Sequence, residues 1–191
     1  MSTIRPMRPA DLFKISSTNL DHLTETYNIG FYLEYLTKWP DLCRVIEGAD
    51  GKIEGYILGK LESSPYPSPI TPFTPSKNPN PNYLPWHGHI TALTVIPAAR
   101  RLGHATRLSA SLEQQADAAR AWFVDLFVRA SNEIGKELYR KMGYSVYRVV
   151  ENYYNDGEDA LDMRKALSRD VERECVRADG ESFRVSPEDV W

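Results

Sequence analysis

The stretch HITALTVIPAARRLGHATRLSASLEQ, residues 89–114, predicts a strand, a tight turn and a helix in direct succession. The first eight residues are mostly apolar or β-branched, and the run stops at Pro97. From Gly103 onward, small and apolar residues recur at helical spacing. The adjacent pair Arg100 and Arg101 lies in the turn, just before that glycine. We therefore expect a strand-to-helix turn that concentrates positive charge.

This turn has the properties of an anion site. The first backbone N–H groups of a helix have no partner within the helix, and the helix dipole adds partial positive charge there. Gly103 has no Cβ, so a phosphate can approach the backbone closely, and Ala105 keeps a neighbouring position small. The sequence contains neither GxxxxGK[ST] nor GxGxxG. The turn predicts a pyrophosphate ligand; the alternative is that its glycine and arginines only cap the helix.

Composition indicates one globular domain of ordinary size. The chain has 191 residues, 42% hydrophobic and 26% charged, and its net charge of −3 gives no basic footprint for nucleic acid. Cys43 and Cys175 lie far apart and match no metal-binding spacing. The sequence shows no signal-peptide pattern and no apolar run of bilayer length. We expect a reduced, cytoplasmic protein without a metal site and without direct contact to nucleic acid or membrane.

The pattern of elements predicts an α/β fold with a mixed central sheet of about seven strands and about four flanking helices. A hairpin over 42–62 turns at Asp50-Gly51. The other expected strands cover 3–8, 87–96, 121–129, 144–154 and 159–167, and the expected helices cover 9–20, 31–40, 103–120 and 132–143.

Two segments depart from this pattern. Residues 63–85 hold eight of the chain's 13 prolines, which predicts an irregular loop insertion, because proline cannot donate to a strand ladder. Residues 168–191 are charged and poor in apolar periodicity, so we expect a weakly ordered tail after a single domain over 1–167.

Two motifs identify a family resemblance. RRLGHA, residues 100–105, resembles the R/Q-x-x-G-x-G/A acetyl-CoA loop of the GNAT acetyltransferase superfamily. SNEIGKELYRKMGYSVYR, residues 131–148, resembles the later motif N-x-x-A-x-x-x-Y-x-x-x-G-F/Y, with Gly135 where alanine is usual. The residues that match this motif are Asn132, Tyr139, Gly143 and Tyr144. The resemblance implies the GNAT fold and acetyl transfer from acetyl-CoA.

Longer stretches resemble the catalytic subunits of NatB-type N-terminal acetyltransferases. They include NLDHLTETYNIGFYLEYLTKWP, HGHITALTVIPAARRLGHA, FVDLFVRASN, GYSVYRVVENYY and DALDMRKALSRD. The resemblance implies transfer of acetyl to the α-amine of nascent chains that begin Met-Asp, Met-Glu, Met-Asn or Met-Gln. It also implies a large auxiliary subunit of helical repeats, which brings the enzyme to the ribosome.

The resemblance assigns the cofactor-binding residues. They are Leu93, Thr94, Val95, Arg100, Arg101, Gly103, His104, Ala105, Asn132 and Tyr139. Backbone N–H groups near Leu93 to Val95 are expected to meet the acetyl carbonyl, where negative charge develops. Asn132 is expected to orient the pantetheine arm, to cap the following helix, or to do both.

Two catalytic residues are expected, each with a simpler alternative. The Tyr139 hydroxyl is placed by the resemblance near the sulfur that leaves, whereas helical spacing alone also fits a core residue. Strand alternation puts His89 and Thr91 on one face, and a histidine has a suitable pKa for a general base. A free α-amine has a pKa of roughly 7.7–8.0, so His89 could equally act only as a hydrogen-bonding group.

The substrate-binding residues are also implied by the resemblance. They are Glu25, Tyr27, Phe31, His89, Thr91, Tyr153 and Tyr154. The resemblance leaves three alternatives open: a lysine-acting GNAT enzyme, an N-terminal acetyltransferase of other specificity, and a non-catalytic scaffold that binds CoA or a partner.

Overall fold

The computed structural model describes residues 2–16, 18–19, 25–80 and 82–190. The chain divides into two compact units. Unit 1 comprises Met1–Lys60 and Ile90–Gln115, and unit 2 comprises Leu61–His89 and Ala116–Trp191. No helix in the described part of the chain has both the length and the apolar character that crossing a membrane requires.

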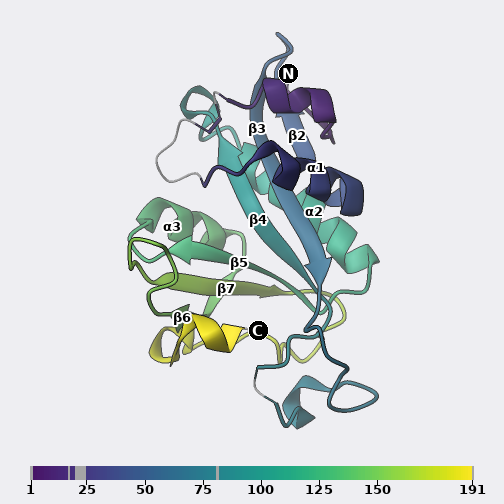
Figure 1. The fold of residues 1–191 in the computed structure, drawn as a ribbon, viewed down its shortest axis with the longest axis vertical. Helices are drawn as coiled ribbons and strands as arrows, with labels where there is room; N and C mark the ends of the chain where they lie inside the picture. The colour runs from purple at the N-terminus through teal and green to yellow at the C-terminus, as the bar shows by residue number, and fades with distance from the viewer. Residues whose placement is uncertain (1, 17, 20–24, 81, 191) are drawn as a thin grey trace. The chain divides into compact units, whose positions relative to one another are not determined.

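Unit 1 is built on antiparallel strands. β1 (Thr3–Pro6) pairs with β2 (Arg44–Glu47), and β2 pairs with β3 (Ile53–Glu62). β4 (His87–Val95) is the next strand in the order, and most of its residues belong to unit 1 (Figure 1). Asp50-Gly51 forms the turn of the β2–β3 hairpin, with Gly51 at a φ of +77°. The expected hairpin and the expected strand before Pro97 are therefore confirmed.

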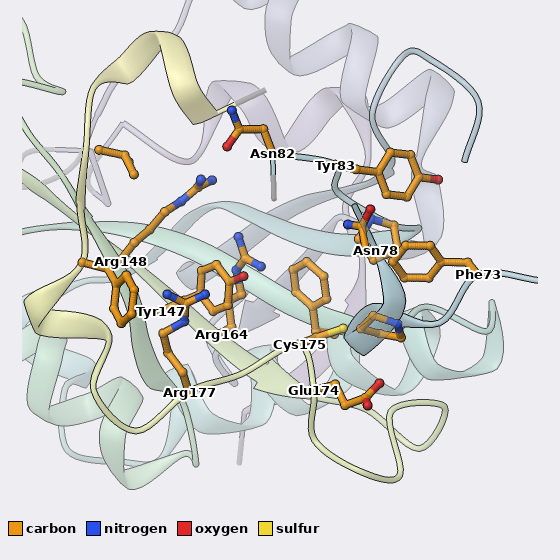
Figure 2. A pocket seen from close by; sticks show the side chains of 15 residues that line it. Phe73, Asn78, Asn82, Tyr83, Tyr147, Arg148, Arg164, Glu174, Cys175 and Arg177 are labelled. Carbon is orange, nitrogen blue, oxygen red and sulfur yellow. The ribbon is translucent and has the colours of Figure 1, made fainter. Parts of the chain in front are cut away.

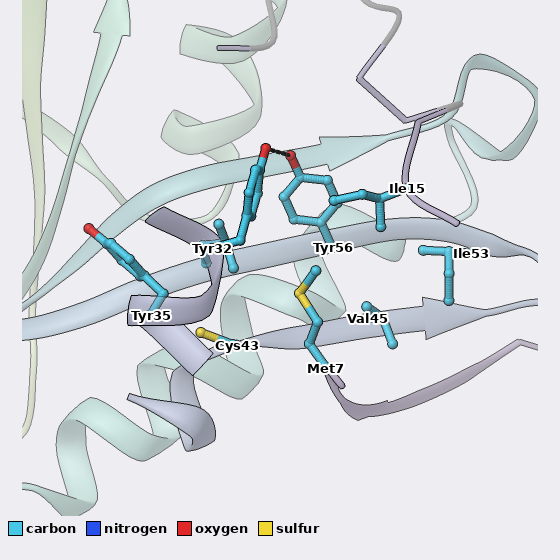
Figure 3. Packing of buried hydrophobic residues seen from close by; sticks show 9 residues of the cluster. Met7, Ile15, Tyr32, Tyr35, Cys43, Val45, Ile53 and Tyr56 are labelled. Carbon is cyan, nitrogen blue, oxygen red and sulfur yellow. Dashed lines mark hydrogen bonds between the residues drawn. The ribbon is translucent and has the colours of Figure 1, made fainter. Parts of the chain in front are cut away.

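Unit 1 contains the α-helix α1 (Ile29–Lys38) and most of the α-helix α2 (His104–Ala118). Its 3-10 helices include η1 (Pro9–Phe13). Tyr32 and Tyr35 of α1 are buried against the strands, and their cluster includes Met7, Ile15, Cys43, Val45, Ile53 and Tyr56 (Figure 3). This burial explains the inward apolar face of α1, whereas Ile29 and Leu33 on the same helix are exposed.

Unit 2 contains the other four strands in the order β5-β7-β6-β8. β5 (Phe123–Arg129) and β6 (Ser145–Val150) both pair antiparallel with β7 (Ala160–Ala166). The short β8 (Arg184–Val185) pairs parallel with β6, so the sheet is mixed as expected. α3 (Glu133–Lys141) connects β5 to β6.

The described residues form eight strands and three α-helices, close to the expected counts. The helix expected over 9–20 is instead a 3-10 helix over Pro9–Phe13. Asp11 accepts hydrogen bonds from the Arg8 backbone and the Arg5 side chain, and the Thr18 hydroxyl donates to the carbonyl of Ile15. Such local bonds compete with α-helical hydrogen bonding. Residues 17 and 20, which belong to the expected helix, and residues 21–24 lie outside the described residues.

The expectation of a weakly ordered tail is wrong for the described residues of that segment. Figure 1 shows the C-terminal segment, in yellow, beside β6. Val190 is 2% exposed and packs with Val150 and Ala160, while the Arg148 guanidinium donates to the carbonyls of Asp189 and Val190. The tail is held by a few long-range contacts, and these leave no apolar periodicity in the sequence.

Apart from the 3-10 helix Pro75–Lys77, the described residues of the proline-rich insertion have almost no regular structure. Its two ends are joined, because Ser64 N–H donates to the carbonyl of Leu84 at 2.9 Å. The ring of Phe73 packs edge-on against Trp122, with centroids 5.6 Å apart. The insertion is therefore irregular and also packed.

Candidate active site

The turn between β4 and α2 has the backbone geometry that the sequence indicated. After the 3-10 turn Pro97–Ala99, Arg101 has a φ of 64° and Gly103 a φ of 78°. A Cβ built on Gly103 would meet no heavy atom within 4 Å, so the space above this backbone is open. The exposed residues from Arg100 to Gly103 surround the N-terminus of the 15-residue helix α2. This arrangement fits the phosphates of a nucleotide cofactor.

His104 differs from its exposed neighbours. Its imidazole is buried, and Nε2 lies 2.8 Å from a carboxylate oxygen of Glu54 on β3. Nδ1 has no hydrogen-bond partner among the described residues. The imidazole therefore helps to attach α2 to β3. Its backbone N–H belongs to the first turn of α2, where such groups have no partner within the helix.

The end of β4 is packed closely against β3. A Cβ on Gly55 would lie 2.7 Å from the carbonyl oxygen of Thr94, so only glycine fits there. The Thr94 hydroxyl donates to the carbonyl of Thr18, and the Val95 carbonyl accepts from Arg100 Nε. These contacts fix the strand segment from which backbone N–H groups are expected to act. Gly55 was not among the residues predicted from the sequence, although a glycine inside a strand often marks such an approach.

His89 lies against a buried carboxylate. Its Nδ1 is 2.8 Å from Oδ1 of Asp125 on β5, and the His89 side chain is 12% exposed. Asp125 is also 3.8 Å from Nε2 of the buried His87. Burial alone would raise the pKa of Asp125, but its electrostatic interactions with His87 and His89 and the His89 hydrogen bond hold that pKa below its ordinary value. An ionised Asp125 accepts a hydrogen bond from Nδ1–H of His89. This tautomer leaves Nε2 of His89 as the nitrogen that can accept a proton.

His87 does not share this role. It is 1% exposed, its Nδ1 lies 2.7 Å from the carbonyl of Pro85, and its ring stacks on Phe123 at 4.7 Å. Burial lowers its pKa, which favours the neutral imidazole. His87 is therefore a core residue of unit 2.

Side chains of β5 contact three residues that the sequence predicted for the site, namely His89, Tyr153 and Tyr154. Strand alternation puts Asp125, Phe127 and Arg129 on one face. Phe127 lies between His89 and Tyr153, at centroid distances of 5.7 and 4.8 Å. The Arg129 guanidinium lies 3.9 Å from the ring centroid of Tyr154. None of these three β5 residues was predicted from the sequence. The signal that could have found them is a charged residue, Asp125, in the middle of the apolar strand FVDLFVR.

Tyr153 and Tyr154 lie in the connection between β6 and β7, beyond the end of β6 at Val150. Their rings meet edge-on at 5.2 Å, and Tyr153 is 38% exposed. The strand expected over 144–154 therefore ends at Val150, and both tyrosines lie in the loop that follows it.

The first turn of α3 confirms one of the two expected roles of Asn132. Its Oδ1 accepts from the backbone N–H of Gly135 at 2.9 Å, which makes it the N-cap. A Cβ on Gly135 would lie 2.8 Å from Asn132 Nδ2, so the glycine leaves room for this cap. Tyr139, further along α3, packs edge-on against Tyr144. Burial raises the pKa of Tyr139, so its hydroxyl keeps the proton at neutral pH.

In unit 1, aromatic residues at four-residue spacing run from Tyr27 along α1. Tyr27 stacks on Phe31 at 4.2 Å, and Phe31 lies 4.7 Å from Tyr35. The Tyr35 hydroxyl lies 2.9 Å from Oγ1 of Thr91 on β4. The structure therefore connects three residues that the sequence selected, Tyr27, Phe31 and Thr91, through Tyr35. Glu25 is exposed just before this row.

Residues 12–144 match the acetyltransferase (GNAT) family. Because this match covers most of the chain and includes the turn, His89 and Tyr139, the chain belongs to that family.

The chain is also similar to individual proteins of known role and to solved structures. The chain is 46% identical over 196 residues to the N-terminal acetyltransferase B complex catalytic subunit naa20 of Schizosaccharomyces pombe, covering 100% of this chain and 99% of the relative. The crystal structure of Chaetomium thermophilum Naa20 in complex with a bisubstrate analogue is similar, with a TM-score of 0.91, 53% identity and 99% of each chain covered. A NatB acetyltransferase complex bound to CoA and MES gives a TM-score of 0.71 and 39% identity, over 86% of this chain and 99% of that one.

Proposed function

We propose that this chain is the catalytic subunit of a NatB-type complex and transfers acetyl from acetyl-CoA to the α-amine of protein N-termini. The open backbone at Gly103, at the N-terminus of α2, carries the proposal. The likeness over the whole chain to a Naa20 crystallised with a bisubstrate analogue supports it.

The turn supplies the groups for cofactor binding. Arg100 and Arg101 are exposed and provide full positive charge, while Gly103, His104 and Ala105 provide backbone N–H groups. Leu93, Thr94 and Val95 provide the strand backbone for the acetyl carbonyl. Asn132 keeps Nδ2 for a further hydrogen bond while its Oδ1 caps α3. When bound, acetyl-CoA supplies the activated thioester.

Proton transfer is assigned to two side chains. In the reaction a bond forms between the amine nitrogen and the acetyl carbon, and the carbon–sulfur bond breaks. His89, oriented by Asp125, takes the proton that the amine loses, directly or through a water molecule. Tyr139, which is protonated at neutral pH, gives a proton to the leaving sulfur and regains one from the solvent, while His89 releases the amine proton to the solvent. A neutral amine is already available near pH 7, so positioning contributes as much as the base.

Selection of the substrate is assigned to polar and aromatic groups. Tyr27, Thr91 and His89 provide hydrogen-bonding groups for an acidic or amide side chain at the second position. Phe31 provides an apolar contact for the initiator methionine, and Glu25 contacts the first residues. Tyr153 and Tyr154 hold the peptide backbone. This set favours nascent chains that begin Met-Asp, Met-Glu, Met-Asn or Met-Gln.

An auxiliary subunit is proposed to dock on the exposed apolar side chains of unit 1. Ile29 and Leu33 lie on one face of α1 and are 58% and 40% exposed, and Phe13 is 82% exposed. The proposed partner is the large helical-repeat subunit of a NatB complex, which places the enzyme at the ribosome in the cytoplasm. The similarity to NatB catalytic subunits supports this assignment.

The test is acetyl transfer from labelled acetyl-CoA to a peptide panel, with and without the co-expressed auxiliary subunit. The panel contains peptides that begin Met-Asp, Met-Glu, Met-Asn, Met-Gln, Ser-Ala and Met-Leu. A peptide with a blocked α-amine and a free lysine is also included. We expect transfer to the first four only.

Each other result has a definite meaning. Transfer to Ser-Ala or Met-Leu peptides would keep N-terminal acetylation and reject the NatB specificity. Transfer to the blocked peptide would indicate a lysine acetyltransferase. Binding of CoA without transfer to any peptide would indicate a scaffold.

A further inference from the structure

A cavity of about 300 Å³ lies in unit 2, and its lining includes none of the residues assigned to the active site. One wall comes from the proline-rich insertion, with Asn78, Asn82 and Tyr83. The other walls come from β6, β7 and the C-terminal tail. Figure 2 shows the side chains of Arg148 and Arg177 on one side of the cavity and those of Asn78 and Tyr83 on the other.

Two buried arginines of this cavity share one carboxylate. Arg148 and Arg164 are 5% and 2% exposed. Arg148 Nε and Arg164 Nη2 each donate to Oδ2 of Asp162 at 2.9 Å, and Asp162 is fully buried. The negative charge of Asp125 also helps to raise the pKa of Arg164. Each nitrogen of Arg148 already donates a hydrogen bond, since Nη1 and Nη2 donate to the carbonyls of Asp189 and Val190. Arg164 donates to Asp162 through Nε and Nη2, which leaves its Nη1 for another acceptor.

Arg177 brings a third guanidinium from the tail. Its centre lies 4.0 Å from the ring centroid of Tyr147 and 4.1 Å from that of Phe183. Arg164 lies 3.5 Å from the centroid of Tyr147 and 4.6 Å from that of Phe123. Rings and guanidinium groups therefore alternate along this wall. Because stacked rings occupy the faces of a guanidinium, its N–H edge is what remains for hydrogen bonding.

The charges that line the cavity are predominantly positive. Glu174 is the one acidic residue among the described lining residues, and it accepts a hydrogen bond from the backbone N–H of Ser76. Arg177 forms no ion pair within the described residues. Because Arg148 and Arg164 share the carboxylate of Asp162, Arg177 supplies the main uncompensated positive charge at this cavity, which is therefore suited to an anion.

We propose that this cavity is a binding site for a small organic phosphate. Phosphate oxygens match the N–H edge of Arg177 and the remaining N–H group of Arg164 at Nη1, and a phosphate ester carries more charge than a carboxylate. A volume of about 300 Å³ holds more than a bare phosphate ion, and aromatic side chains cover much of its wall. The bound molecule would bridge the insertion and the tail, since both line the cavity.

The experiment uses the full-length chain with saturating CoA, so that phosphates cannot bind at the turn before α2. Phenyl phosphate, inorganic phosphate and benzoate are titrated separately by isothermal calorimetry. We expect one equivalent of phenyl phosphate to bind at least tenfold more tightly than either other probe. Equal affinity for benzoate or for inorganic phosphate overturns the assignment, as does the absence of binding.

Two variants connect the binding to the cavity. Arg177→Gln should weaken phenyl phosphate binding roughly tenfold to a hundredfold, as expected for loss of a charge-assisted hydrogen bond. Arg173→Gln makes the same change at an exposed position in the same segment, outside the cavity lining, and should change affinity less than twofold. Equal affinity of both variants would overturn the proposal.

Hydrogen exchange provides a readout that does not depend on these variants. In the unsubstituted chain, phenyl phosphate should slow amide exchange in 73–85 and in 174–185, because both segments line the cavity. The segment 100–105 should not respond, because CoA already occupies the turn. Protection at 100–105 alone would place the phosphate at the cofactor turn and overturn the proposal.

Discussion

Asp125 and His89 are 36 positions apart in sequence, yet Oδ1 of the first lies 2.8 Å from Nδ1 of the second. The contact joins the middle of β5 to the start of β4, the strand that leads into the turn before α2. Its geometry is that of a base and the group that orients it.

Replacing Asp125 by asparagine should lower kcat about tenfold to a hundredfold, because the imidazole of His89 loses its anionic partner. The KM for acetyl-CoA should change less than threefold. His89→Ala should cost at least as much. The double variant should be no slower than His89→Ala, since the two residues act as a unit. Independent, multiplying losses in a steady-state assay would contradict the pairing, and circular dichroism checks that each variant is folded.

Replacing Gly103 by alanine should weaken CoA binding at least tenfold, because a Cβ would project into the open space where we propose that the phosphates meet the backbone. The strain of a φ of +78° should cost about 1 kcal/mol of folding free energy. Gly157→Ala is the matched control, since Gly157 has a φ of +83° in the β6–β7 connection. It should lower Tm by a similar amount and leave CoA affinity unchanged. Calorimetric titration of CoA that finds the two variants alike would refute the assignment.

The two expected roles of Asn132 can be separated by substitution. Asn132→Ala removes the N-cap of α3 and should cost about 1 kcal/mol of stability. Asn132→Asp keeps a capping oxygen and should keep most of that stability. If the amide also binds the cofactor, both variants should lose CoA affinity. Thermal melts and CoA titrations on the same samples separate the outcomes, and full affinity in Asn132→Asp would leave capping as the sole role.

Glu158 predicts a specific dependence of stability on pH. Hydrogen bonds from Ser131 and Arg129 lower its pKa from 4.5 to about 2. A carboxylate with a lowered folded-state pKa contributes stability that is present above its unfolded value and is lost as the pH falls toward the folded value. The contribution of Glu158 should therefore disappear between pH 4.5 and about 2.

Glu158→Gln tests this dependence by thermal melts at pH 7, 4 and 3. The variant should be less stable at pH 7 and should approach the unsubstituted chain as the pH falls. Glu188→Gln, at an exposed position of the tail, is the control and should leave the difference constant. A constant deficit for Glu158→Gln across the range would show that its carboxylate is not linked to folding.

Tertiary contacts account for the predictions that failed. The tail was expected to be weakly ordered because its sequence has no apolar stripe, but Val190 and the backbone of β8 hold it in place. The helix expected over 9–20 had a proline start and apolar spacing, yet side-chain bonds from Arg5 and Thr18 favour shorter turns. In both places, contacts with the backbone or with distant residues outweighed the local pattern.

The sequence by itself determined the order of elements, the turn at 97–104 and the cap at Asn132. Each depends on residues close in the chain: a glycine that accepts a positive φ, an asparagine that caps three residues ahead, and apolar spacing along one strand or helix. Only the tertiary structure decided which carboxylate faces His89, that Phe127 lies between His89 and Tyr153, and that Arg177 joins two buried arginines at one cavity. These contacts join residues far apart in the chain, and a pairing between distant positions produces no local periodicity from which to infer it.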